Sequence, residues 1–232
     1  TIVFHSSSSD LVPGDFNDQM DVFLFRLASA ELVRANNKNL GVEANGPSFN
    51  PSVSGDGKVI VFESLATNLQ TSGQETSGRQ IFVWETGKFE ASSIFAITSG
   101  NGESKTPSID ASGNAVVFAS DATDIQATSF GQNTVDSNNQ TDVFLFYLDT
   151  NSTHLVNLNK FNQQATGGPS DQPVISGDGS VIAYRSSATN LVFEKGIATV
   201  EVVNGGVGYF GSPTIIVADL NQSGTGAELG FH

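Results

Sequence analysis

The chain has 232 residues, no cysteine, and 10 Lys and Arg against 24 Asp and Glu, which gives a net charge of -14. A field of that sign repels phosphate backbones, so we expect no nucleic-acid partner, and the lack of cysteine excludes disulfides and thiolate metal sites. No run of 18 apolar residues is present, so we expect no membrane-spanning segment. The 24 Gly and 17 Phe, among many Ser, Thr, Asn and Val, predict an all-β fold.

An eleven-residue pattern occurs four times along the chain. The copies are TIVFHSSSSDL at 1–11, VIVFESLATNL at 59–69, AVVFASDATDI at 115–125 and VIAYRSSATNL at 181–191. In each copy an aromatic residue (Phe4, Phe62, Phe118 or Tyr184) lies seven positions before an aliphatic one. A pattern repeated at similar spacing over most of a chain predicts tandem structural repeats.

Each repeat predicts four strands. A strand beginning at Pro51, Pro107 or Pro173 leads into a glycine-rich turn, and Gly-Asp-Gly at 55–57 and 177–179 suits a tight hairpin. The aromatic strand follows, then a long loop, then an apolar strand (DVFLF at 21–25 and 142–146, QIFVW at 80–84) and a weaker strand near 32–33, 94–97 and 155–158. Four antiparallel strands per repeat are typical of a β-propeller blade, and a β-sandwich explains the in-register copies less well.

The run P-x-[IV]-S-x-D-G, a VIxF strand, S-x-A-T-N-L and D-x-N-x-x-x-D-V-F resembles the TolB-type, WD-like β-propeller repeats of bacterial envelope and secreted proteins. The resemblance covers residues 1–193, and it implies an exported protein, extracellular or at the cell surface, with the periplasm as the alternative. We expect an incomplete propeller at 1–195, because the first repeat begins at its second strand and the last stops before its third. About three and a half blades are therefore present, and the rest of a longer chain or a homo-oligomer would complete the propeller.

The last segment, 196–232, has no blade pattern. Its run V-x-N-G-G-x-G-Y followed by P-T-I and G-T-G-A is similar to short Gly-rich β-repeats of bacterial surface proteins and phage structural proteins. We expect a small Gly-rich β extension here, with strands at 198–203 and 214–218. A string G-x-G-x-x-G at 206–211 is interpreted as a turn, because no helix follows it.

Two matching acidic loops precede the two DVFLF strands. Side-chain oxygens at alternate positions of one turn are the ligands that calcium prefers. The candidate calcium ligands are Asp15, Asn17, Gln19 and Asp21 in the first loop, and Asp136, Asn138, Gln140 and Asp142 in the second. The alternative interpretation is that these Asp and Asn side chains only make Asx turns. The middle repeat has Gln74, Thr76 and Gly78 at the matching places, so we expect no calcium there.

Signals for catalysis are weak. No G-x-S-x-G motif is present, and the histidines His5, His154 and His232 form no metal-ligand pair. His5 aligns with Glu63, Ala119 and Arg185 in the other repeats, a variation that predicts an outward-facing strand position. The loop aromatics are Phe16, Phe49, Phe130, Phe161 and Phe210, and they either line a sugar- or protein-binding surface or fill loop bases.

These observations predict a protein that is not an enzyme. We expect a calcium-stabilised extracellular propeller segment that serves binding or structural assembly at the cell surface, with a protein or glycan partner. Two alternatives stay open. The segment could gate substrate for a secreted hydrolase, or it could act as a TolB-like periplasmic adaptor that binds a protein. A role in a virion or appendage is suggested only by the C-terminal repeat.

Overall fold

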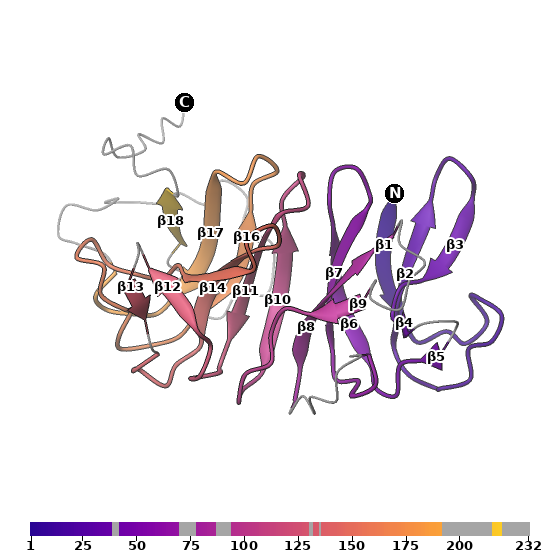
Figure 1. Cartoon of the computed structure of the whole chain (residues 1–232), viewed down its shortest axis with the longest axis horizontal. Helices are drawn as coiled ribbons and strands as arrows, with labels where there is room; N and C mark the ends of the chain where they lie inside the picture. The colour runs from indigo at the N-terminus through magenta and orange to yellow at the C-terminus, as the bar shows by residue number, and fades with distance from the viewer. Residues whose placement is uncertain are drawn as a thin grey trace, which may run out of the picture.

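The computed structural model describes residues 1–38, 42–69, 78–86, 94–129, 132–134, 136–191 and 215–219 (Figure 1). Within these ranges every regular element is a β-strand, which confirms the all-β prediction. Among the same residues, no helix is long and apolar enough to cross a membrane.

Four antiparallel sheets follow one another along the chain, and Figure 1 shows them side by side. The first contains β1 (Ile2–Ser6), β2 (Asp21–Arg26) and β3 (Glu31–Arg34). The second contains β6 (Ser48–Val53), β7 (Val59–Ser64), β8 (Gln80–Glu85) and β9 (Ile94–Ala96). The third has β10 (Ser104–Ile109), β11 (Ala115–Ser120), β14 (Asp142–Tyr147) and β15 (Ser152–Leu155). The fourth has β16 (Ser170–Ile175), β17 (Val181–Ser186) and β18 (Ile215–Asp219).

These sheets are propeller blades. Within each one, antiparallel strands that follow one another along the chain lie side by side, and each sheet packs against the next. The first strands of the last three sheets, β6, β10 and β16, contact one another in that order, and we call them the inner strands. The first sheet has no inner strand among the described residues. The chain is therefore a partial propeller, as predicted.

The repeated aromatic residues form the core of each blade. Phe4 stacks on Phe23, Phe62 on Phe82 and Phe118 on Phe144, with ring centroids 5.5, 5.9 and 5.7 Å apart. Aliphatic side chains fill the spaces between sheets, for example Val22 and Leu24 of β2 against Ile60 of β7. Alternating strand positions therefore bury one face against the preceding blade and the other against the next.

The two ends of the blades differ in construction. At the hairpin end, the turns between first and second strands bond to one another, since Gly55 N donates to Ala111 O and Ala111 N donates to Gly177 O. Positive φ angles of 73° at Gly57 and 72° at Gly179 confirm the role predicted for Gly-Asp-Gly. At the opposite end, which we call the loop end, the long connections leave the blades. These join second to third strands and one blade to the next.

Three features depart from the sequence prediction. Part of the long loop in the third repeat forms a hairpin, β12 (Ala127–Ser129) and β13 (Gln132–Thr134), which extends the third sheet beyond β15. The short strands β4 (Asn37–Lys38) and β5 (Val42–Glu43) form a ladder between the first two blades. The fourth strand of the third blade ends at Leu155 rather than Leu158, because Phe144 pairs with Leu155 while Leu158 bridges to Gln164.

The C-terminal segment is described only at 215–219. There β18 pairs antiparallel with β17 and takes the third-strand place of the fourth blade, close to the strand expected at 214–218. The strand expected at 198–203 lies outside the described residues. The division of the chain into 1–195 and 196–232 stays a prediction.

Candidate functional site

The two acidic loops occupy equivalent places at the loop end, each ahead of the third strand of its blade. In the first blade, Asp15 and Asp21 are 7% and 0% exposed, and Glu43 from β5 lies beside them. The carboxylates converge on Arg34 at the end of β3, a residue that sequence reasoning did not single out. Arg34 Nη1 lies 3.1 Å from Asp15 Oδ1, 3.1 Å from Asp21 Oδ2 and 2.7 Å from Glu43 Oε1.

Arg34 is therefore the cation of the first loop. Its other nitrogens donate to Asn37 Oδ1 at 2.7 Å and to Gly14 O at 3.1 Å, so the guanidinium is fixed on several sides. Burial raises the pKa of Asp15, and the negative charge of Asp21 raises it further. The positive charge of Arg34 lowers it by less than Asp21 raises it. Burial also raises the pKa of Glu43, but hydrogen bonds from Phe16 N and Arg34 together outweigh it and lower this pKa.

In the third blade the same arrangement has no cation among the described residues. Leu155 stands in the register place of Arg34, because Phe144 pairs with Leu155 as Phe23 pairs with Arg34. Gln164 bridges the carboxylates instead, and its Nε2 donates to Asp136 Oδ1 and Asp142 Oδ2 at 2.7 Å each. No Lys or Arg among the described residues makes an ion pair with Asp136 or Asp142.

Asp142 is 1% exposed, and the described residues that donate to its carboxylate are neutral. Asn157 and Asn138 donate to Oδ1, and Gln164 donates to Oδ2. Burial raises the pKa of Asp142, and the neighbouring Asp136 raises it further. The second carboxylate oxygen of Asp136, Oδ2, is buried and has no hydrogen-bond partner.

Both loops also contain the Asx turns that were the alternative interpretation. Asn17 Oδ1 accepts from Gln19 N at 2.9 Å, and Asn138 Oδ1 accepts from Gln140 N at 2.6 Å. The amide of each Asn donates to the Asp four residues later, Asp21 or Asp142. It also donates to a carbonyl of the next connection, Ala44 O or Ala165 O. The Asn oxygens are thus engaged in the turn, and the carboxylates are the oxygens that face the bridging group.

The middle blade replaces the buried Asp with Gln80, which is 0% exposed and donates from Nε2 to Gly102 O at 3.1 Å. Of the matching loop positions only Gly78 is described, and Gln74 and Thr76 lie outside the described residues. Three repeats thus show three arrangements at one place: Asp21 bound to Arg34, a neutral Gln80, and Asp142, which has no counter-charge in the described part of the chain.

The donor sets differ in how well they suit a calcium ion. Asp15 and Asp21 already share the Arg34 guanidinium, so a second cation there would meet a fixed positive charge. Asp136 and Asp142 offer two carboxylates, one oxygen of which has no partner. The Gln164 amide oxygen is engaged elsewhere, because it accepts from Ser137 N and Oγ at 3.0 Å each. Among the described residues, no group of three or more His, Cys, Asp or Glu is arranged to hold a metal ion.

His5 is exposed, as predicted, but its equivalents in the middle repeats are not. Glu63 and Ala119, its equivalents in the middle blades, are both 0% exposed. Glu63 Oε1 accepts from Thr106 N of the next inner strand at 2.6 Å, and Oε2 pairs with Arg79 at 2.9 Å. His5 makes a similar link, since its Nδ1 accepts from Asn50 N. The position lies between blades, so it is exposed only in the outermost ones.

The other loop and histidine predictions are placed as follows. Phe16 is 84% exposed and Phe161 is 67% exposed, both in loop-end connections, with Lys160 Nζ 5.1 Å from the Phe161 ring centroid. Phe49 is half-buried under the guanidinium of Arg79. His154 Nδ1 bonds to the Thr128 hydroxyl at 3.1 Å. Phe130, Phe210 and His232 lie outside the described residues.

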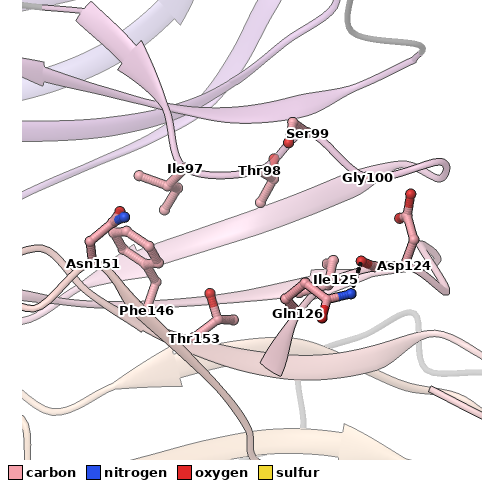
Figure 2. A pocket seen from close by; sticks show the side chains of 10 residues that line it. All are labelled: Ile97, Thr98, Ser99, Gly100, Asp124, Ile125, Gln126, Phe146, Asn151 and Thr153. Atoms are coloured by element: carbon pink, nitrogen blue, oxygen red, sulfur yellow. Dashed lines mark hydrogen bonds between the residues drawn. The ribbon is translucent and has the colours of Figure 1, made fainter. Parts of the chain in front are cut away.

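A cavity of about 300 Å³ lies between the second and third blades. Figure 2 shows its lining side chains, among them Thr98, Phe146, Asn151 and Thr153, with Asp124 at one side. Asp124 is its single charged residue, and Asp124 Oδ1 accepts from Asn101 N at 2.8 Å. The volume is at the lower limit of ligand pockets, which run from about 300 to 1,000 Å³.

Similarity to known proteins is found among solved structures. No protein-family model matches the chain, and no curated protein matches it. Solved structures do match. TolB from Acinetobacter baumannii has a TM-score of 0.47 and 16% identity over 88% of this chain and 36% of that one. A TolB from Agrobacterium tumefaciens has a TM-score of 0.40 and 23% identity over 71% of this chain and 49% of that one.

An enzyme, oligogalacturonate lyase in complex with manganese, matches at a TM-score of 0.42 and 9% identity over 71% of this chain and 35% of that one. A tricorn protease and prolyl endopeptidases also match. The prediction that the chain is not an enzyme was drawn from the blade pattern, and it is wrong. The matching structures include enzymes as well as TolB, so the pattern does not distinguish the two. The chain spans about a third to a half of the length of the TolB structures. With TM-scores below 0.5, these likenesses add no argument to the strand topology described above.

Proposed function

We propose that the chain is a protein-binding segment of an exported β-propeller protein and that it contacts its partner with the loop end of its blades. The single observation that carries this proposal is the exposure of two phenylalanines, Phe16 at 84% and Phe161 at 67%, on loop-end connections of different blades. Exposed aromatic side chains on such connections can anchor a partner, since a few anchor residues carry most of the binding energy of an interface.

The opposite end of the blades is a poorer candidate. Its turns are short, and they are bonded to one another through Gly55, Ala111 and Gly177. The turn carboxylates of Asp56 and Asp178 accept hydrogen bonds from within their own turns. The loop end, by contrast, has long connections and braced backbones, such as Phe16 N donating to Glu43 Oε1 at 2.8 Å.

The charge of the chain indicates the chemistry of the partner. With a net charge of -14, the protein would attract a partner surface that combines basic side chains with apolar ones. We place the protein outside the cell or at its surface, with the periplasm as the alternative. A protein partner suits the exposed phenylalanines and the negative field together, and a glycan partner is an alternative that the test below separates.

The test is affinity enrichment from extracellular and envelope fractions of source cells, compared across three forms of the chain. We expect the wild type and Leu27→Ser to enrich the same protein. The double variant Phe16→Ser/Phe161→Ser should no longer enrich it. Leu27 is the matched control because it is also exposed, at 64%, but lies on the turn after β2 at the other end. Enrichment of glycan alone, or equal recovery by the double variant, would contradict the proposal.

We also propose that the acidic loop of the third blade takes up calcium, as predicted for Asp136 and Asp142, with Asn138 and Gln140 holding the turn. Support comes from the missing counter-charge and the unpartnered Asp136 Oδ2. Bound calcium would supply the positive charge that Arg34 provides in the first blade. The first loop is not part of this proposal.

Calcium binding is tested by thermal unfolding with millimolar calcium and with a chelator. A ligand specific to the folded state adds about 2.7 kcal/mol at a hundred times its dissociation constant. The rise in melting temperature should persist in Asp56→Asn, which removes an exposed carboxylate, and vanish in Asp136→Asn/Asp142→Asn. An equal rise in the last variant, or no rise in the wild type, would refute the site.

A further inference from the structure

The cavity between the second and third blades contains a carboxylate whose equivalents in two other repeats are amides. Asp124 lies in the connection after β11, and Asn68 and Asn190 occupy the same place in the second and fourth blades. In all three side chains Oδ1 accepts from a backbone N–H of the connection that leads into the blade. The donors are Asn45 N at 3.0 Å, Asn101 N at 2.8 Å and Thr166 N at 2.8 Å. The third repeat therefore differs in the other terminal atom of the side chain, which is an oxygen instead of an NH₂ group.

That terminal atom is a hydrogen-bond donor in the two amides. The Nδ2 atoms donate to backbone carbonyls of the same connection, at 2.7 Å to Glu43 O and at 2.9 Å to Gln164 O. Each carbonyl belongs to the residue two positions before the N–H that bonds Oδ1, and at that spacing the third repeat has Ser99. An ionised carboxylate only accepts hydrogen bonds. Asp124 Oδ2 and Ser99 O thus take the places of a donor and its acceptor, and neither can donate to the other.

The two oxygens lie where a ligand can reach them. Both residues line the cavity, and Asp124 is exposed. Among the residues that the structure describes, none donates to Asp124 Oδ2 or to Ser99 O, and no Lys or Arg pairs with Asp124. An ammonium group carries three N–H donors and a positive charge, so one such group can bond to a carboxylate and a carbonyl together. The missing amide of this repeat is therefore a place for a ligand amine.

The rest of the cavity indicates the body of the ligand. Its floor is apolar and is formed by Phe146, which is 5% exposed, together with Ile97 and Ile125. Polar side chains surround this floor, and Figure 2 shows two of them, Asn151 and Asp124, at opposite sides of the cavity. A volume of about 300 Å³ suits a small molecule. An apolar floor within a polar rim matches a molecule that has an apolar face and several hydroxyl groups.

We propose that this cavity binds a small hydroxylated amine, of the chemical class of free amino sugars. The ligand ammonium lies between Asp124 Oδ2 and Ser99 O, and ligand hydroxyls bond to polar rim groups such as the Asn151 amide. The lining contains no Lys or Arg, and the net charge of -14 favours a cationic ligand. This site goes beyond the protein-binding role, and neither Phe16 nor Phe161 lines it.

The probe is glucosamine, titrated into the isotope-labelled chain and followed by the NMR shifts of backbone amides. At about pH 6 the Asp124 carboxylate and a primary amine both carry charge. We expect saturable shifts at Asn101 and Thr153 and none at Ile182 of β17. Glucose, which has the hydroxyls without the amine, should bind at least tenfold more weakly. Equal affinity for glucose, or no saturable shift with glucosamine, would overturn the proposal. The same shifts with calcium chloride would also overturn it, because a metal ion would then take the place of the amine.

Asp124→Asn tests the donor argument without a folding defect. Its amide should donate to Ser99 O, so the variant should melt at or above the wild-type temperature and bind glucosamine at least tenfold more weakly. Asp18→Asn removes one exposed carboxylate of the first blade and should bind within twofold of the wild type. A clear drop in the melting temperature of Asp124→Asn, or equal weakening by Asp18→Asn, would contradict the site. Phe16→Ser/Phe161→Ser should bind glucosamine normally whether or not it loses a protein partner, so the two proposals can fail separately.

Discussion

Replacing Arg34 with methionine tests the ionic core of the first loop. The guanidinium is 4% exposed, and it contacts Asp15 and Asp21, whose side chains are 3% and 0% exposed. Methionine keeps much of the side-chain volume and removes the charge. The variant leaves two buried carboxylates with no cation among the described residues, which is the arrangement that the third blade has naturally.

The expected cost follows from this burial. Removing one partner of a buried ion pair costs about 3 to 5 kcal/mol, because the remaining charge is left uncompensated. For a domain of this size each kcal/mol corresponds to about 2 to 4 °C, so the melting temperature should fall by about 6 to 20 °C. Arg185 pairs with Asp171, and its side chain is 53% exposed. Arg185→Met should therefore lower the free energy of unfolding by at most about 1 kcal/mol.

Urea unfolding at neutral pH, followed by circular dichroism, measures both free energies. Arg34→Met combined with Asp21→Asn should recover part of the lost stability, because one of the two stranded charges is then removed. The reasoning would be refuted if Arg34→Met and Arg185→Met lost the same small amount. It would also be refuted if the second substitution deepened the loss.

Three further predictions concern other carboxylates and one turn. The pKa of Asp142 is raised by burial and by Asp136, so without calcium its charge costs stability increasingly as pH rises above about 4. Urea unfolding at pH 4.5 and 7 should therefore show wild type losing stability relative to Asp142→Asn at the higher pH, and the opposite trend would contradict the burial argument. The pKa of Asp56 is lowered to about 2 by hydrogen bonds from Lys58 N and the Ser54 hydroxyl. Carboxyl NMR should show it rise in Ser54→Ala, and an unchanged value would exclude that bond. Gly57→Ala should cost at least about 1 kcal/mol, because φ is 73° and a Cβ would lie 2.4 Å from Thr1 Oγ1, whereas Gly177→Ala should be tolerated.

Most of the fold could be predicted because its repeats are nearly in register. The aromatic markers predicted the strands that stack Phe4 on Phe23 and Phe62 on Phe82. The Gly-Asp-Gly segment at 55–57 predicted its hairpin through the backbone angle of the second glycine. The hairpin of β12 and β13 was missed, because its sequence has no copy in the other repeats to align with.

The site was harder to predict, because its bridging groups come from other strands. Arg34 follows Asp21 by 13 residues and Gln164 follows Asp142 by 22, and neither belongs to the loop motif. A comparison of the repeats could have found them, since Leu155 replaces Arg34 while the acidic pair is retained. The burial of Glu63 and Ala119, the equivalents of His5, was not predicted for a related reason. Variation at a repeated position reflects different neighbours between blades as readily as exposure to water.

The measurement that bears most directly on the central claim is site-specific photo-crosslinking in source cells. A photoreactive aromatic residue would replace Phe16, Phe161 or Leu27 in turn, and adducts would be identified by mass spectrometry. The account predicts that positions 16 and 161 capture one and the same protein and that position 27 does not. Adducts at position 27 alone, or no shared adduct at 16 and 161, would contradict binding through the loop end.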